Sequence, residues 1–239
     1  MKFFLAPMQG LTGYTVRNAF HHHFDYIDKY YTPFIPAAKR MNAKIKRDID
    51  PVNNDGITLI PQAMSIVADE VIDLHRQLVP YGYDEINVNL GCPSGTVVSK
   101  KRGSGILAYP DMLDSFLDEL YTKADFPVSI KTRVGFNDDE LWPRLIEIYS
   151  KYPISELIVH PRVQKDFYKN TPRMDDFALA MQKINPDKTT LCYNGDITDT
   201  NSFNALTDCF PDIDEIMIGR GLFANPALIA ELKGISMDK

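Results

Sequence analysis

The sequence is poor in cysteine: Cys92, Cys192 and Cys209 are the only three among 239 residues, and none has the paired spacing Cys-x-x-Cys. An odd number of scattered cysteines argues against a disulfide framework and against a zinc site. Long apolar runs are also missing, since none approaches the ~20 residues that cross a bilayer. The apolar start Met1–Met8 is too short for a signal peptide and has no small-residue cleavage site. These absences predict a cytoplasmic protein that uses neither a metal nor a membrane.

Positive charge is in short supply as well. The chain has 26 Lys and Arg against 32 Asp and Glu, which gives a formal net charge of −6. Binding to a polyanion needs a positive surface, because phosphate neutralisation provides most of the non-specific affinity. The total therefore weakens a nucleic-acid function without excluding it, because a net-acidic chain can carry a local basic region.

What the chain does have is a regular alternation of strand-like and helix-like segments. The β-rich runs are Phe3–Met8, Lys29–Ile35, Thr58–Met64, Glu85–Gly91, Val128–Val134, Glu156–Arg162, Thr190–Asp196 and Glu215–Arg220. The amphipathic stretches between them include Ala68–Leu78, Asp111–Tyr121, Leu141–Lys151, Met174–Ile184 and Thr200–Cys209. Eight βα units in this order, in a chain close to the roughly 250 residues of such a fold, favour a (β/α)8 TIM barrel. We expect residues 1–239 to form it as a single domain, and an open doubly wound sheet is the alternative.

The longest irregular stretch is Pro36–Asp55, which is rich in Lys, Arg and Asn. It fits either a loop over the barrel mouth or an ordinary solvated connection.

Polar side chains alternate with apolar ones near the ends of four predicted strands. In the fourth run, Asn87 and Asn89 share one face and the apolar side chains share the other. The same alternation brings three further pairs into phase: Lys131 with Arg133, His160 with Arg162, and Asn194 with Asp196. Inward-facing polar groups are costly unless they bind something, and barrel active sites lie at the carboxyl ends of the strands. The pattern predicts an active site there.

Cys92 follows the fourth run directly. Gly91 and Pro93 on either side force a sharp exit from the strand, which would present the thiol at the barrel mouth. A cysteine in that place can act as a nucleophile or as a general acid. The alternative is a buried, inert cysteine.

Six short motifs follow one another on successive predicted strands. They are Ala6-Pro7-Met8, Asn89-Leu90-Gly91-Cys92-Pro93-Ser94, Lys131-Thr132-Arg133, His160-Pro161-Arg162, Asn194-Gly195-Asp196 and Gly219-Arg220-Gly221. In this order they resemble tRNA-dihydrouridine synthases, from residue 3 to about residue 230. Each motif alone is weak, and the resemblance depends on all six in register.

The resemblance implies FMN as the cofactor. The residues it assigns to FMN are Pro7, Met8, Gln9, Gln62, Lys131, His160, Asn194, Gly195, Asp196, Gly219 and Arg220. Gln62 is expected at the pyrimidine edge of the flavin, and Lys131 near N1 and O2, where negative charge develops on reduction. The last five residues are expected at the phosphate, after strands seven and eight.

The resemblance also implies a reaction, the reduction of uridine to 5,6-dihydrouridine in tRNA. NADPH reduces FMN, a hydride passes from flavin N5 to C6 of the uracil, and Cys92 protonates C5. Asn89, Arg133 and Arg162 are the residues implied to bind the substrate. The uridine must leave the folded tRNA by flipping out.

The chain departs from the family in three places. Gly13–Arg17 stands where the family usually has an Asp and a Pro-Phe-Arg run, and Val163 stands where it often has Thr. The sequence stops after the last predicted helix, where the family has a small helical domain that helps to grip tRNA. We expect either a piece of a longer chain or a barrel-only member, with weaker tRNA binding if that domain is truly missing.

Three alternatives remain. The first is an FMN-dependent dehydrogenase or reductase of a free pyrimidine, such as a dihydroorotate dehydrogenase. The second is a barrel-only relative with impaired tRNA binding, and the third is a cofactor-free lyase that uses Lys131 as a Schiff base. The sequence predicts no oligomeric state.

Overall fold

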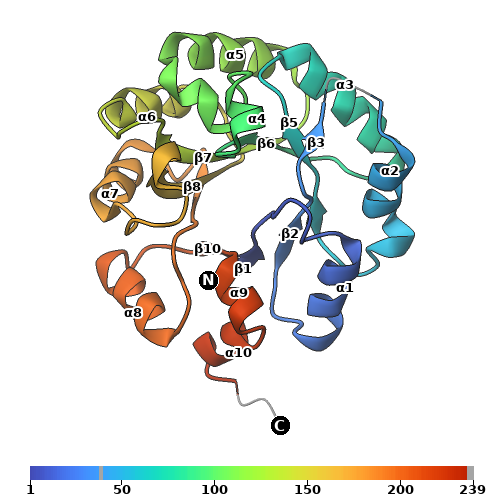
Figure 1. Ribbon diagram of the computed structural model, residues 1–239, viewed down its shortest axis with the longest axis vertical. Coiled ribbons are helices and arrows are strands. Elements are labelled where there is room, and N and C mark those ends of the chain that lie inside the picture. Colours follow the sequence, from blue (N-terminus) through green and yellow to red (C-terminus); the bar gives the residue numbers. More distant parts are fainter. Residues whose placement is uncertain (38–39, 236–239) are drawn as a thin grey trace.

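The computed structural model describes residues 1–37 and 40–235, and it shows a ring of short parallel strands surrounded by helices (Figure 1). The strands are β1 (Lys2–Leu5), β2 (Lys29–Tyr31), β3 (Ile35–Pro36), β4 (Leu59–Ile60), β5 (Gln62–Met64), β6 (Ile86–Leu90), β7 (Val128–Gly135), β8 (Glu156–Val163), β9 (Thr190–Tyr193) and β10 (Glu215–Ile218). All observed strand pairs are parallel, as βαβ connections require.

The ring closes through two interrupted strands. The expected run Lys29–Ile35 becomes β2 and β3, and Thr58–Met64 becomes β4 and β5, so ten short strands replace the eight expected. Pro61 separates β4 from β5, and a proline has no N–H to donate to a neighbouring strand. β2 pairs with β1 and β4, and β5 pairs with β3 and β6. The two parts of each interrupted run therefore share the pairing between them, and the sheet continues from β10 round to β9. The prediction of a TIM barrel is confirmed, with the strand count corrected.

Helices cover the outside of the ring. They are α1 (Tyr14–His23), α2 (Ala43–Ile49), α3 (Ala68–Leu78), α4 (Gly95–Val98), α5 (Pro110–Lys123), α6 (Trp142–Ser150), α7 (Met174–Lys183), α8 (Thr200–Cys209), α9 (Arg220–Ala224) and α10 (Leu228–Leu232), with 3₁₀ turns η1 (Pro51–Asn53), η2 (Val79–Tyr81), η3 (Gly103–Ala108) and η4 (Gln164–Asp166). Figure 1 shows α9 and α10 between α8 and α1, where the outer layer closes. No helix of the described ranges is long and apolar enough to span a membrane.

The stretch Pro36–Asp55, expected to be irregular, contains β3's last residue, α2 and η1. Asn42 begins α2, and its side-chain oxygen accepts a hydrogen bond from the Ile45 N–H at 3.0 Å. Residues 38–39 of this stretch lie outside the described residues, as do residues 236–239 at the end of the chain. The expectation of a structureless loop was therefore wrong for residues 43–49.

Strand side chains divide between two apolar layers. The larger one lies between sheet and helices and includes Phe3 and Leu5, whereas Phe4 belongs to a small second cluster on the other face of the sheet. Cys192 is in this second cluster and is fully buried. The alternation seen in the sequence is thus the alternation between the outer layer and the barrel interior.

The amino-terminal end of the barrel is closed by buried charged groups. Lys29 Nζ lies 2.7 Å from Glu156 Oε2, and the Tyr31 hydroxyl donates to the other oxygen of Glu156. Lys2 Nζ lies 3.0 Å from Glu215 Oε1, but Glu215 Oε2 is buried and has no hydrogen-bond partner among the described residues. Burial, and then the charge of Glu156, raise the pKa of Glu215.

A raised pKa in the folded state means that ionised Glu215 destabilises the fold above that pKa. Glu215→Gln is therefore expected to increase the free energy of unfolding at about pH 8 by about 1 kcal/mol. The gain should vanish as the pH falls toward about 3, below the ordinary glutamate pKa of about 4.3, where the carboxyl is protonated in both states. Urea unfolding across this range measures it, with exposed Glu147→Gln as the control. A Glu215→Gln protein less stable than wild type at pH 8 would show that the Lys2 ion pair outweighs the burial cost.

Candidate active site

A cavity of about 410 Å³ opens at the carboxyl ends of the strands. Its lining residues are Ala6, Pro7, Met8, Gln9, Leu11, Phe34, Gln62, Asn89, Gly91, Cys92, Pro93, Lys131, Arg133, His160, Tyr168, Asn194, Gly195, Asp196, Gly219 and Arg220. Every residue predicted for the site is among them except Arg162. Leu11, Phe34 and Tyr168 were not predicted. Leu11 and Tyr168 lie in loops, where no strand alternation marks the inward face, and Phe34 lies in the interruption between β2 and β3.

Cys92 is held from two sides. The side-chain oxygen of Asn89 accepts hydrogen bonds from the backbone N–H groups of Gly91 (3.1 Å) and Cys92 (2.9 Å). The Cys92 carbonyl accepts from both the hydroxyl (2.8 Å) and the N–H (3.1 Å) of Ser104. Gly103, with φ of +55°, lets this loop approach, because a Cβ there would lie 2.8 Å from the same carbonyl. The loop after β6 therefore presents the thiol in one fixed position.

Burial raises the pKa of the Cys92 thiol, and the Ser94 N–H, Arg133 and Lys131 oppose this only in part. At neutral pH the sulfur therefore keeps its proton. A protonated thiol at the edge of a cavity can donate a proton, whereas a nucleophilic cysteine needs a lowered pKa. Of the two roles predicted for Cys92, the electrostatics favour the general acid.

A chain of amide groups crosses the cavity floor to this loop. Asn89 Nδ2 donates to Gln62 Oε1 at 2.7 Å, and Gln62 Nε2 donates to Asn87 Oδ1 at 2.8 Å. Asn87 Nδ2 in turn donates to Ser129 Oγ at 3.0 Å. Each amide group thus holds the next one in a single orientation. The chain of bonds therefore determines whether Gln62 and Asn89 present a donor or an acceptor atom to a ligand.

Lys131 lies beside Asn89 on the neighbouring strand, β7, and lines the same cavity. Its ammonium has no hydrogen-bond or ion-pair partner among the described residues. Burial, followed by the nearby charge of Arg133, lowers the pKa of Lys131 to about 7. A half-buried cation without a partner among the described residues fits a cavity that receives an anionic or strongly hydrogen-bonding group.

His160 and Arg162 lie side by side on β8. Arg162 Nη1 donates to His160 Nε2 at 3.1 Å, and because a guanidinium only donates, Nε2 must accept. Burial, and then the surrounding cations led by Arg133, lower the pKa of His160, so the ring is neutral with its proton on Nδ1. The lining of the cavity therefore includes one neutral imidazole in a fixed tautomer.

Arg162 itself is 1% exposed and lies behind the cavity wall. Its guanidinium forms a two-bond pair with Asp196 and also donates to the Asn170 carbonyl. Arg220 Nη2 donates to the same Asp196 at 2.6 Å from the other side. Arg162 thus orients His160 and Asp196, and its predicted contact with substrate stays a prediction.

The guanidinium of Arg133 also donates its hydrogen bonds to other parts of the protein. It donates to the carbonyls of Gly91 (3.0 Å), Val163 (3.0 Å) and Phe167 (2.9 Å). These bonds tie β7 to the loops after β6 and β8. Val163 stands where a threonine was expected. Its backbone N–H and carbonyl form the hydrogen bonds in this region, and its side chain is buried, so the valine removes no bond that the structure uses here.

The loops after β9 and β10 are packed too tightly for side chains. A Cβ on Gly195 would lie 1.9 Å from the Tyr193 hydroxyl, and a Cβ on Gly221 would lie 2.0 Å from the Ile197 carbonyl. The backbone of Gly195 and Gly219 is therefore exposed to the end of the cavity, beside Arg220 and its ion-pair partner Asp196. Nowhere in residues 1–37 and 40–235 do three His, Cys, Asp or Glu side chains form a metal-binding group.

Comparison with known proteins identifies the family of this chain. The family model described as dihydrouridine synthase matches residues 4–238. The chain belongs to the dihydrouridine synthase family. The prediction is thereby confirmed at the level of family and enzyme class.

Among curated members, a tRNA-dihydrouridine synthase B of Pasteurella multocida is 26% identical over 98% of this chain and 69% of its own length. A probable tRNA-dihydrouridine synthase of Staphylococcus aureus is 34% identical over 63% of this chain and 46% of its own. The chain thus spans about half to two thirds of the length of these relatives.

Solved structures share the barrel. Morphinone reductase superimposes with a TM-score of 0.64 at 10% identity, over 100% of this chain and 87% of its own. The 3-hexulose-6-phosphate synthase of Salmonella typhimurium gives 0.59 at 14% identity, over 98% and 96%. At such identities the likeness shows the fold alone.

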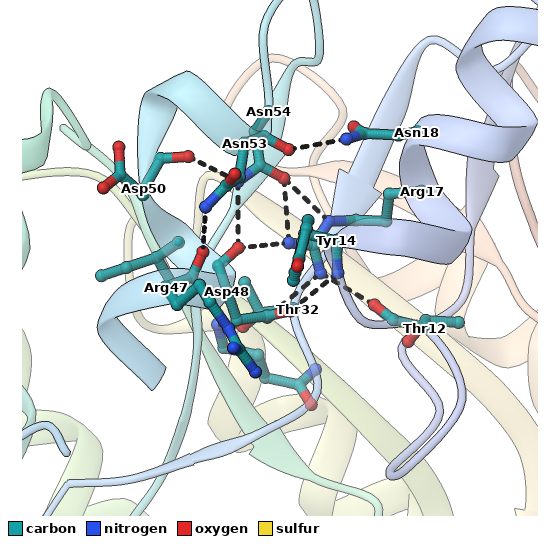
Figure 2. A network of polar contacts seen from close by, with 12 residues as sticks. Thr12, Tyr14, Arg17, Asn18, Thr32, Arg47, Asp48, Asp50, Asn53 and Asn54 are labelled. Carbon is teal, nitrogen blue, oxygen red and sulfur yellow. Dashed lines mark hydrogen bonds and ion pairs between the residues drawn. The ribbon is translucent and has the colours of Figure 1, made fainter. Parts of the chain in front are cut away.

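This member of the family braces the turn after β1 with a buried arginine (Figure 2). Arg17 on α1 is fully buried and donates to the Thr12 carbonyl (2.8 Å), to the carbonyl (2.6 Å) and a carboxylate oxygen (3.2 Å) of Asp48, and to Asn54 Oδ1 (2.9 Å). The Thr12 hydroxyl accepts from the Met8 N–H at 2.8 Å. The network therefore links α2 and η1 to the cavity-lining residue Met8.

The same network explains the departure at Gly13. Gly13 begins α1 without a side chain to cap it, and Asp48 Oδ1 accepts from the Tyr14 N–H at 2.7 Å instead. A carboxylate from α2 thus replaces the aspartate that the resemblance predicts at the start of α1.

Arg17→Met should reduce the free energy of unfolding by about 3 kcal/mol, because it leaves Asp48 and Asn54 without their buried partner. Arg17→Lys keeps the charge without the fork of donors and should lose less. Urea unfolding measures both, with exposed Arg47→Met as the control. Equal stability of Arg17→Met and Arg47→Met would contradict a structural role for the network.

Proposed function

We propose that this chain binds FMN in the cavity and reduces uridine in tRNA to 5,6-dihydrouridine, with NADPH as the reductant. The observation that carries the proposal is that two groups line the same cavity: the protonated thiol of Cys92, in the loop after β6, and the half-buried side chain of Lys131 on β7, which has no partner among the described residues. Residues 1–239 would form the catalytic barrel as one domain, and a tRNA substrate places it in the cytoplasm.

The lining fits FMN at both ends. The bare backbone of Gly195 and Gly219 and the guanidinium of Arg220 would receive the phosphate at the end of the cavity. Lys131 would hold the pyrimidine edge of the ring, aided by Gln62, while Met8 and its neighbours would lie along the ring. When bound, FMN supplies the hydride for C6 of the uracil.

The chain's own groups would do the rest. Cys92 Sγ would give its proton to C5 of the uracil, and Lys131 would stabilise the negative charge at the cofactor. Asn89 would orient the uracil, since its amide is locked by Gln62 and by the Cys92 loop. Arg133 would act through the loops that it ties together and at the cavity wall.

Reduction of a free pyrimidine is the second candidate. The net charge of −6 favours it over a large polyanionic substrate. Incubation of the protein with FMN, NADPH and unmodified tRNA, followed by mapping of dihydrouridine along the tRNA, separates the two. Product at a defined tRNA position supports our proposal, while turnover of free uracil or orotate with no product on tRNA contradicts it.

A further inference from the structure

Two adjacent aromatic residues lie at the mouth of the cavity, after β8. Tyr168 lines the cavity. Its neighbour Phe167 does not line the cavity, and Phe167 is 46% exposed. The Phe167 backbone has φ of +50° and ψ of −92°, a conformation that residues with a side chain rarely adopt. Backbone strain of this kind concentrates at functional sites.

The surrounding bonds keep the strained residue in place. Its N–H donates to the Gln164 carbonyl at 3.1 Å, and its carbonyl accepts from Arg133 Nη2 at 2.9 Å. Asp166, which is buried, accepts from the Val163 N–H at 3.1 Å and from side chains farther along the segment. The exposed ring is therefore presented on a rigid support, one arm of which is the cavity residue Arg133.

Cationic residues lie close to Phe167 in the sequence although the whole chain is acidic. Lys165 and Lys169 are exposed on either side of Phe167, and neither has an ion-pair partner among the described residues. The guanidinium groups of Arg133 and Arg220 lie 5.5 and 4.8 Å from the centre of the Tyr168 ring. An exposed aromatic ring flanked by free ammonium groups is complementary to a nucleotide, whose base stacks and whose phosphate is negative.

We propose that Phe167 is the stacking surface for the nucleobase next to the uridine that enters the cavity, with Lys165 and Lys169 near its phosphates. This inference rests on the proposed function. A uridine that leaves its stack exposes the face of its neighbour, and a rigid ring at the cavity mouth can cover that face. Such stacking contributes about 1–3 kcal/mol per base, which corresponds to about 5- to 150-fold in affinity.

The experiment compares three variants of the FMN-loaded protein. Phe167→Gly removes the ring and relieves the strained backbone, Phe167→Trp keeps a stacking surface, and Val79→Ala removes an exposed apolar side chain at the other end of the barrel. The dissociation constant for unmodified tRNA is measured without NADPH. We expect it to rise about 5- to 150-fold for Phe167→Gly and to stay within about twofold for the other two.

Phe167→Gly should keep its melting temperature and its FMN content, so a loss of tRNA binding would not reflect unfolding. An unchanged tRNA affinity in Phe167→Gly overturns the inference, as does an equal loss in Val79→Ala. A wild type that binds no tRNA contradicts both the inference and the proposed function, whereas a wild type that binds tRNA and forms no dihydrouridine contradicts the proposed function alone.

Discussion

Replacement of Cys92 with alanine is expected to slow dihydrouridine formation by at least about 100-fold, while FMN binding stays within about twofold of wild type. The thiol is the one group of the cavity that combines a raised pKa with a position fixed by three hydrogen bonds to its loop. Without it the carbanion-like C5 of the uracil has no proton donor within the protein. The backbone bonds of Asn89 and Ser104 do not involve the side chain of residue 92, so the cavity should keep its shape.

Single-turnover mixing of the reduced enzyme with tRNA, with dihydrouridine quantified over time, measures the effect. Cys209→Ala on α8 is the matched control, because the Cys209 thiol is exposed and Cys209 does not line the cavity. Cys92→Ala with the wild-type rate would remove Cys92 from the mechanism.

The pH dependence offers a second check on the same residue. Because burial raises the pKa of Cys92, its proton is retained through neutral pH and is lost only above the ordinary thiol range of about 8.5. The rate of the protonation step should therefore be flat around pH 7 and fall at higher pH. A rate that instead rises with pH in this range would indicate a thiolate nucleophile.

The parts of the site that lie on strands could be predicted, because period-two alternation fixes which way a side chain points. Lys131 and Asn89 follow from this rule, and their place side by side follows from the parallel register of β6 and β7. What Arg162 does could not be predicted. It points inward as expected, but its partner Asp196 comes from another loop and draws the guanidinium behind the wall.

Most of the site residues that could not be predicted from the sequence lie in loops. Tyr168 enters the cavity, and Phe167 reaches its strained backbone, only because Arg133 and Asp166 fold the segment after β8 back on itself. No local periodicity encodes those long-range bonds. The helix α2 is different, because the sequence does indicate where it begins. Asn42, three residues before Ile45, is a typical N-cap residue, but the polar composition of the surrounding stretch alone indicates a loop.

Lys131→Met is expected to have opposite effects on stability and on catalysis. In the absence of FMN, the pKa of about 7 lies far below the ordinary lysine value of about 10.4, so the protonated side chain destabilises the folded protein at lower pH. Stability of the wild type should rise as the pH increases from about 7 toward 10, where the folded protein holds fewer protons than the unfolded chain. Lys131→Met, which has no charge to bury, should therefore be more stable by about 1–3 kcal/mol at about pH 6 and gain less at higher pH.

Catalysis should suffer by about 100- to 1000-fold in the same variant, because a preorganised charge at a developing anion contributes to that extent. Addition of FMN should reverse the order of stability, since Lys131 then has a partner and methionine does not. Thermal unfolding with and without FMN, at pH values on both sides of about 7, measures this crossover. A Schiff-base lyase predicts something else: borohydride with a carbonyl substrate would trap an adduct on Lys131, and FMN would leave the stability of both proteins unchanged. That outcome would replace the flavin proposal, whereas the crossover would tie the partnerless ammonium to the cofactor.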